Sequence, residues 1–120
     1  MITNKFHRDI GFEPEAVKEI MTGLSRFSQL RYTQHAKFET IKDRYSIIPV
    51  IKLSDIKPEE IFEYTREGSR IVKFAVRLTG LDRVLDFCYS VSLDGNVITV
   101  WANTKEDSHR TLNEGLYARV

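Results

Sequence analysis

The side chains best suited to chemistry stand near the end of the chain, where His109 is followed directly by Arg110. A histidine titrates near neutral pH and can act as general acid or base, and an arginine beside it can hold a phosphate. Metal-free cleavage of RNA needs such groups, to move the proton of the ribose 2′-hydroxyl and to balance charge on the phosphorane. The competing interpretation is a solvated polar tail. His109 and Arg110 are therefore candidate catalytic residues.

A second histidine, His35, stands in the first turn of a helix expected over residues 33–45, with Thr33 as its N-cap. It borders an apolar stripe formed by Phe38, Ile41 and Tyr45, where a histidine is more often a boundary residue than a catalyst. At about 100° per residue, Arg44 lies roughly 180° around the helix from His35. His35 remains a candidate catalytic residue, but on a different helix face from Arg44.

Around these residues the chain has a helical first half. Residues 1–12 lack a period and are expected to form an arm or a short strand. From Pro14 apolar residues recur at helical spacing, at Val17, Ile20, Met21, Leu24, Phe27 and Leu30. Residues 47–53 are rich in β-branched side chains and are expected to be extended, and Pro49 favours an edge strand there. Pro58 opens a third expected helix that runs to Glu67 and ends at Gly68.

The second half predicts an antiparallel meander over 70–78, 83–93 and 96–104. Asp94-Gly95 is a strong two-residue hairpin signal. It sets three pairs on one face: Phe87 with Ala102, Tyr89 with Val100, and Val91 with Ile98. A four-residue turn over 79–82 sets three more pairs on the same face: Val76 with Leu85, Phe74 with Phe87, and Val72 with Tyr89. Two independent turns thus predict one core face.

The same register predicts an unusually polar opposite face. Its expected rows are Lys73–Cys88–Trp101, Ala75–Asp86–Asn103 and Ile71–Ser90–Thr99, with Arg77 near the first turn. Trp101 would stack a base, Lys73 and Arg77 would attract phosphate, and Asn103 would join the RNA-binding surface. The alternative is a half-buried face in which Trp101 only packs and Lys73 pairs with Asp86. The position of the N-terminal helix would decide between the two.

The composition and the absence of certain motifs exclude several classes of function. The formal net charge is +1, so nucleic-acid binding would need a local basic cluster. One cysteine, Cys88, excludes an internal disulfide, and the N-terminus carries no apolar leader, so we expect a cytoplasmic protein without a membrane partner. No paired Cys spacing, His-Glu-x-x-His motif or glycine-rich phosphate loop is present, so we expect neither metal nor cofactor.

Short motifs carry a family resemblance. Residues 32–38 read Tyr-Thr-Gln-His-Ala-Lys-Phe, residues 43–45 read Asp-Arg-Tyr, and residues 56–64 are followed by Glu67-Gly68. Together they resemble small RelE-related domains, in the group of RelE, barnase and colicin-nuclease-like ribonucleases. The resemblance covers about residues 30–105. It implies a toxin-type fold that cuts RNA without metal on an open sheet face, with His35 and Arg44 at the family's histidine and arginine positions. The near-neutral charge and the extra first 29 residues depart from that pattern.

The sequence therefore predicts one α+β domain over residues 1–120, with N-terminal helices followed by a three- to four-stranded antiparallel β-meander. Its parts are an arm (1–12), a mostly helical region (13–67), the meander (70–104) and a C-terminal tail (105–120). The first functional hypothesis is a RelE-like, metal-independent endoribonuclease or a toxin-related RNA-binding protein, with a cognate antitoxin as a further partner. The alternative is a non-catalytic phage or mobile-element protein that binds and inhibits a host protein. Either form could self-associate.

Overall fold

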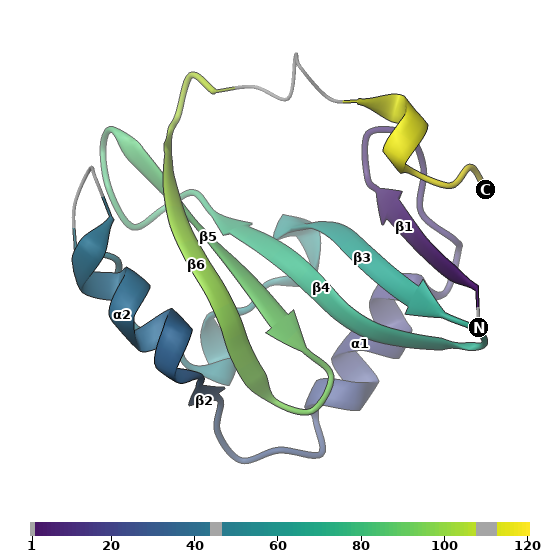
Figure 1. The fold of residues 1–120 in the computed structure, drawn as a ribbon, viewed down its shortest axis with the longest axis horizontal. Helices are drawn as coiled ribbons and strands as arrows, with labels where there is room; N and C mark the ends of the chain where they lie inside the picture. Colours follow the sequence, from purple (N-terminus) through teal and green to yellow (C-terminus); the bar gives the residue numbers. More distant parts are fainter. Residues whose placement is uncertain (1, 44–46, 108–112) are drawn as a thin grey trace.

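The computed structural model describes residues 2–43, 47–107 and 113–120. These residues form one six-stranded sheet and two α-helices (Figure 1). The strands are β1 (Thr3–His7), β2 (Arg31–Tyr32), β3 (Ile61–Glu67), β4 (Arg70–Leu78), β5 (Leu85–Ser92) and β6 (Asn96–Thr104). The helices are α1 (Ala16–Leu24) and α2 (Gln34–Lys42), with short 3₁₀ turns at Leu53–Asp55, Pro58–Glu60 and Glu114–Leu116.

The strand order in the sheet is β1-β3-β4-β5-β6-β2, and every neighbouring pair is antiparallel except β2 with β6. In Figure 1 α1 lies behind the sheet and α2 lies beside β6. The hydrophobic core lies between α1 and the sheet. There Ile20 and Leu24 of α1 pack with Phe74, Val76 and other buried residues of the strands. The opposite, front face of β4, β5 and β6 is not covered by α1 (Figure 1).

The α+β class is confirmed, but the predicted order of elements is wrong. Residues Thr3–His7 form a strand at one edge of the sheet, before either helix. The three expected β segments do pair consecutively as antiparallel strands. They belong, however, to a larger mixed sheet rather than to a separate three- to four-stranded meander.

The third predicted helix is wrong: only Pro58–Glu60 forms a 3₁₀ turn, and Ile61–Glu67 is strand β3. The burial of β3 explains the error. Ile61, Tyr64 and Thr65 are buried, at the i, i+3, i+4 spacing of a helix. Two register shifts against β4 interrupt the two-residue alternation of this strand and produce the false period. Gly68 lies in the turn that follows, with φ +59°.

Helix α2 has the predicted N-cap, because Thr33 Oγ1 accepts a hydrogen bond from Ala36 N at 3.1 Å. Its buried face was predicted wrongly. Ala36 and Thr40 are buried, whereas Phe38 and Ile41 are exposed by 59% and 64%. A small buried face brings the helix axis close to β6 and leaves the larger apolar side chains outside. Residues 47–53 form no strand, but Ile48 and Ile51 extend the core.

The β5–β6 hairpin pairs Phe87 with Ala102 and Tyr89 with Val100, as predicted. Val91 pairs with Val97 instead of Ile98, because the register shifts after Ser90. The turn itself is longer than two residues: Gly95 N donates to Ser92 O at 3.0 Å, and Gly95 has φ +88°. A Cβ at Gly95 would also lie 3.1 Å from the Phe27 ring, so glycine is favoured there on two grounds.

The β4–β5 hairpin is displaced by four residues from its predicted register, because Val76 pairs with Tyr89 instead of Leu85. The loop between these strands is longer than the expected turn, and Asp82 organises it. Its Oδ2 accepts hydrogen bonds from Val84 N at 2.8 Å and Leu85 N at 2.9 Å. Because the displacement is an even number of residues, each side chain stays on its predicted face of the sheet. The residues predicted to lie opposite one another on β4 and β5 are wrong.

A search of the described residues finds no helix with the length and apolarity that a membrane span requires.

Candidate functional site

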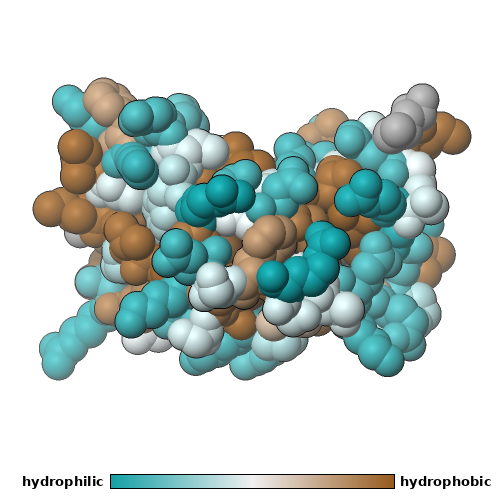
Figure 2. All heavy atoms as spheres, turned by 90° about the horizontal axis from the view of Figure 1, so that it is seen from below, coloured by the Kyte–Doolittle hydropathy of each residue, from teal (hydrophilic) through white to brown (hydrophobic). Residues whose placement is uncertain are grey.

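The polar face of the sheet is open and hollowed. Figure 2, which looks along the sheet from below Figure 1, shows a depression on the upper side between two raised flanks. That upper side is the front of Figure 1, opposite α1. The predicted row of Lys73 with Cys88 and Trp101 is corrected by the hairpin register to Arg77–Cys88–Trp101. The neighbouring row is Ala75–Ser90–Thr99. Trp101 is partly exposed on this face, which α1 does not cover.

One side of this face is covered by the C-terminal segment. Ala118 N donates to Lys5 O at 2.7 Å, and the Tyr117 hydroxyl donates to Glu63 Oε1 at 2.7 Å. The Tyr117 ring also meets the His7 ring edge-on, with centroids 5.2 Å apart, and His7 is only 2% exposed. The open part of the face therefore belongs to β4, β5 and β6.

Arg77 does not extend into the open face as a free phosphate ligand. Its Nε donates to Asp86 Oδ2 at 2.8 Å, and its two terminal nitrogens donate to Asp107 O at 3.0 Å and Thr104 O at 3.1 Å. Asp86 also pairs with Lys105 at 2.7 Å, in place of the expected pair with Lys73. Burial acts to raise the pKa of Asp86, but hydrogen bonds from Lys105 and Arg77 outweigh it and lower that pKa overall. This charged cluster is built into the end of the sheet.

Cys88 is an unsuitable nucleophile. It is 1% exposed, and burial raises the pKa of its thiol to about 12. Asn103 Nδ2 lies 3.7 Å from Cys88 Sγ, so the amide of Asn103 is held against the face beside Trp101. Cys88 therefore contributes packing, and Asn103 and Trp101 carry the polar and aromatic character of β6.

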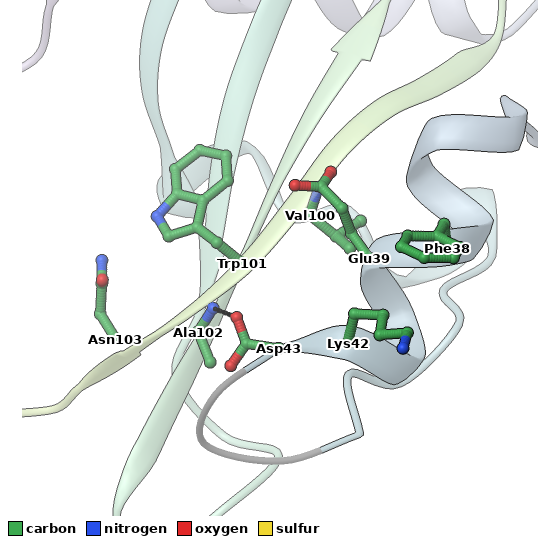
Figure 3. A pocket seen from close by; sticks show the side chains of 8 residues that line it. All are labelled: Phe38, Glu39, Lys42, Asp43, Val100, Trp101, Ala102 and Asn103. Carbon is green, nitrogen blue, oxygen red and sulfur yellow. Dashed lines mark hydrogen bonds between the residues drawn. The ribbon is translucent and has the colours of Figure 1, made fainter.

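A hollow of about 530 Å³ lies where α2 meets β6. Figure 3 shows Glu39 and Asp43 projecting from α2 toward the strand, with Phe38 and Lys42 on the helix side. Trp101 and Asn103 line the hollow from β6. Carboxylates, aromatic rings and an ammonium group thus share one concave site.

The two carboxylates of this hollow cap the free edge of β6. Glu39 Oε1 accepts from Val100 N at 3.1 Å, and Asp43 Oδ1 accepts from Ala102 N at 3.4 Å (Figure 3 draws the second bond). Four helical residues rise about 6 Å and two strand residues about 6.6 Å, so Glu39 of α2 and Asp43, its C-cap residue, match alternate N–H groups of β6. Beyond the two-residue contact of β2, these two side-chain hydrogen bonds replace strand pairing at the edge of β6.

His35 lies outside the hollow but is linked to it through Glu39. His35 Nε2 is 3.2 Å from Glu39 Oε1, the same oxygen that caps Val100, and the His35 side chain is 67% exposed. A histidine oriented by a carboxylate and open to solvent can move a proton to or from a bound ligand. His35 is thus linked through Glu39 to the hollow that Trp101 and Asn103 line.

The remaining predicted site residues are not brought into this group. Lys73 is exposed on β4 and pairs with Ser92, in another part of the same face. His109, Arg110 and Arg44 lie outside the described residues. Sequence reasoning missed Glu39 and Asp43, whose i, i+4 spacing on a helix next to a strand was the available signal.

Comparison of the chain with protein-family models, curated protein sequences and solved structures finds no match. Among the described residues no group of three or more His, Cys, Asp or Glu side chains is arranged to hold a metal ion.

Proposed function

We propose that the hollowed sheet face binds single-stranded RNA, as expected of a toxin-related, RelE-like domain. The observation that carries the proposal is a partly exposed tryptophan, Trp101, on an open and otherwise polar sheet face. Stacking of bases on an aromatic ring of a sheet is a common mode of single-strand recognition. Partly exposed Ser90, Thr99 and Asn103 stand on the same face and offer hydrogen bonds to bases or sugars.

The charges of this face favour the proposal. Asp86, the carboxylate within it, is balanced by Arg77 and Lys105 at 2.8 and 2.7 Å. Lys73 is exposed and forms no ion pair with any residue that the structure describes. One exposed cation outside any ion pair among the described residues, on a nearly neutral protein, supports modest RNA binding with a small salt dependence.

Cleavage is the stronger form of the same proposal. His35 and His109 would supply the acid and base, and Arg44 and Arg110 would hold the scissile phosphate. Support comes from the position of His35, which shares Glu39 with the edge of β6.

RNA binding is tested by the anisotropy of a dye-labelled single-stranded RNA of twelve nucleotides. Substituting Trp101→Ala should weaken binding by about 1–3 kcal/mol, the usual contribution of one stacked base. Trp101→Phe, which keeps a ring, should recover part of the loss. Equal affinity of all three proteins would refute the role of Trp101.

Cleavage is tested by incubating the protein with the same RNA in the presence of a chelator. Activity should persist, and should fall in His35→Ala and His109→Ala, since acid–base groups typically contribute about 100- to 10,000-fold. Full cleavage by both variants would exclude the assignment. If the protein binds the RNA but does not cleave it, the cleavage proposal is wrong and only the RNA-binding proposal stands.

A second candidate function, binding of a host protein, is favoured by apolar side chains that the fold leaves outside. Phe38 and Ile41 on α2 are exposed by 59% and 64%, and Figure 2 shows hydrophobic side chains gathered at the end where α2 lies. Protein interfaces use such surfaces. Phe38→Ser with Ile41→Ser should then abolish stoichiometric recovery of one partner protein, without changing the fold seen by circular dichroism. Unchanged recovery would exclude this surface.

A further inference from the structure

We propose that the hollow between α2 and β6 is a docking site for an extended, basic segment of a partner protein. In this mode the segment pairs with the edge of β6 and displaces the carboxylates of Glu39 and Asp43. The hollow adjoins the proposed RNA-binding face and shares Trp101 and Asn103 with it, but the inference does not depend on RNA binding.

The edge of β6 beside α2 is held by side chains and not by another strand. Val100 N and Ala102 N point out of the sheet and are capped by side-chain carboxylates instead of by another strand. Side-chain caps are easier to displace than a paired strand, because a released carboxylate is hydrated again by water. An incoming chain would offer its carbonyl oxygens to the same two N–H groups, as in other complexes formed by strand addition.

The carboxylates of Glu39 and Asp43 make the hollow complementary in charge to a basic segment. Displaced from the two N–H groups, Glu39 and Asp43 would still stand on the wall of the hollow and face the added chain. Lys42, the basic residue of the hollow, has its Nζ 5.3 Å from the centre of the Phe38 ring. Lysine or arginine side chains on the partner would pair with the carboxylates. Such carboxylates would repel an acidic segment.

Aromatic rings in the hollow also favour a basic partner. Phe38 and Trp101 line the hollow from the two opposite elements. An aromatic face attracts a guanidinium or ammonium group, most strongly when the pair is partly desolvated. Aromatic rings and carboxylates together therefore select basic residues.

The chain contains a single tryptophan, so the fluorescence of Trp101 reports directly on this hollow. The probes are three capped hexapeptides: alternating valine and arginine, alternating valine and glutamate, and the arginine peptide with N-methyl groups on alternate amides. We expect a saturable fluorescence change with the arginine peptide. The glutamate peptide should not bind, and N-methylation should remove binding because it blocks strand pairing.

The matched variant is Glu39→Gln with Asp43→Asn, which removes both charges but keeps oxygen acceptors for Val100 N and Ala102 N. It should keep the circular dichroism spectrum and melting temperature, and bind the arginine peptide about tenfold more weakly or worse. The control, Glu59→Gln with Asp94→Asn, makes the same change in net charge at exposed positions elsewhere and should bind normally.

The inference is overturned if the arginine peptide does not bind, if the glutamate or N-methylated peptide binds equally well, or if the Glu39→Gln, Asp43→Asn variant binds like the parent. Because no RNA is present in this titration, its failure is separate from failure of the proposed RNA binding.

Discussion

Nε of Arg77 lies 2.8 Å from Oδ2 of Asp86, and both side chains are nearly buried, with 12% and 7% of their surface exposed. The pair closes the end of the sheet where β4 and β5 meet the segment after β6. Through Asp107 O and Thr104 O, Arg77 also holds the backbone that leaves β6. Arg77 thus stabilises the folded sheet through its own hydrogen bonds, although its position on a polar face suggested ligand binding.

Removing Arg77 should destabilise the protein strongly. Arg77→Ala leaves Asp86 with Lys105 alone and frees two backbone carbonyls, so we expect a loss of about 3–5 kcal/mol in the free energy of unfolding. Urea denaturation measures it. The control is Arg83→Ala, an exposed arginine of the neighbouring loop, which should change stability by less than about 0.5 kcal/mol. Equal stability of the two variants would show that the pair contributes little.

The stability should depend on pH through Asp86. Its pKa is lowered in the folded protein, so its contribution is complete above the unfolded value of about 4 and is lost as the pH falls through the folded value. Urea denaturation at pH values from neutral to about 3 should therefore show a steeper loss for the parent than for Asp86→Asn. If the free energy of unfolding falls equally with pH in the two proteins, Asp86 does not cause the acid sensitivity.

Lys73 should contribute one phosphate contact to RNA binding. Lys73→Ala should weaken binding and reduce the magnitude of the salt slope by about one unit or slightly less. Lys18→Ala is the matched control, since Lys18 is exposed on α1, on the opposite side of the sheet. Anisotropy titrations from low to moderate salt measure both slopes. If both variants lose affinity equally, the effect is one of net charge and not of the proposed face.

Cys88 should behave as an unreactive thiol. With 1% exposure and a pKa of about 12, it is protonated at neutral pH and shielded from reagents. Labelling with a disulfide reagent should be slow in the native protein and fast in urea. RNA binding by Cys88→Ala should match the parent. Rapid labelling of the native protein would contradict the burial of Cys88.

Local patterns in the sequence predicted several elements correctly, each for a local reason. Thr33 caps α2 because its side chain and the backbone it serves are three residues apart. The β5–β6 pairs near Tyr89 follow from a turn only a few residues away. Side-chain alternation placed Trp101, Asn103 and Lys73 on the polar face even where the register was displaced.

The errors arose where distant segments decide the outcome. Strand β3 reads as a helix because its two register shifts depend on β4, a separate strand. Helix α2 exposes Phe38 because the edge of β6, some sixty residues later, needs Glu39 and Asp43 close by. No short stretch of sequence contains that requirement.

The sequence by itself determined the α+β class, the three consecutive strands of the second half and the polar character of one sheet face, since these depend on alternation and turn chemistry within short stretches. Only the tertiary structure decided that α1 lies behind that face, that Arg77 belongs to the fold, and that α2 caps β6. Those outcomes depend on which distant surfaces meet, and burial and hydrogen bonding settle that only when the whole chain is packed.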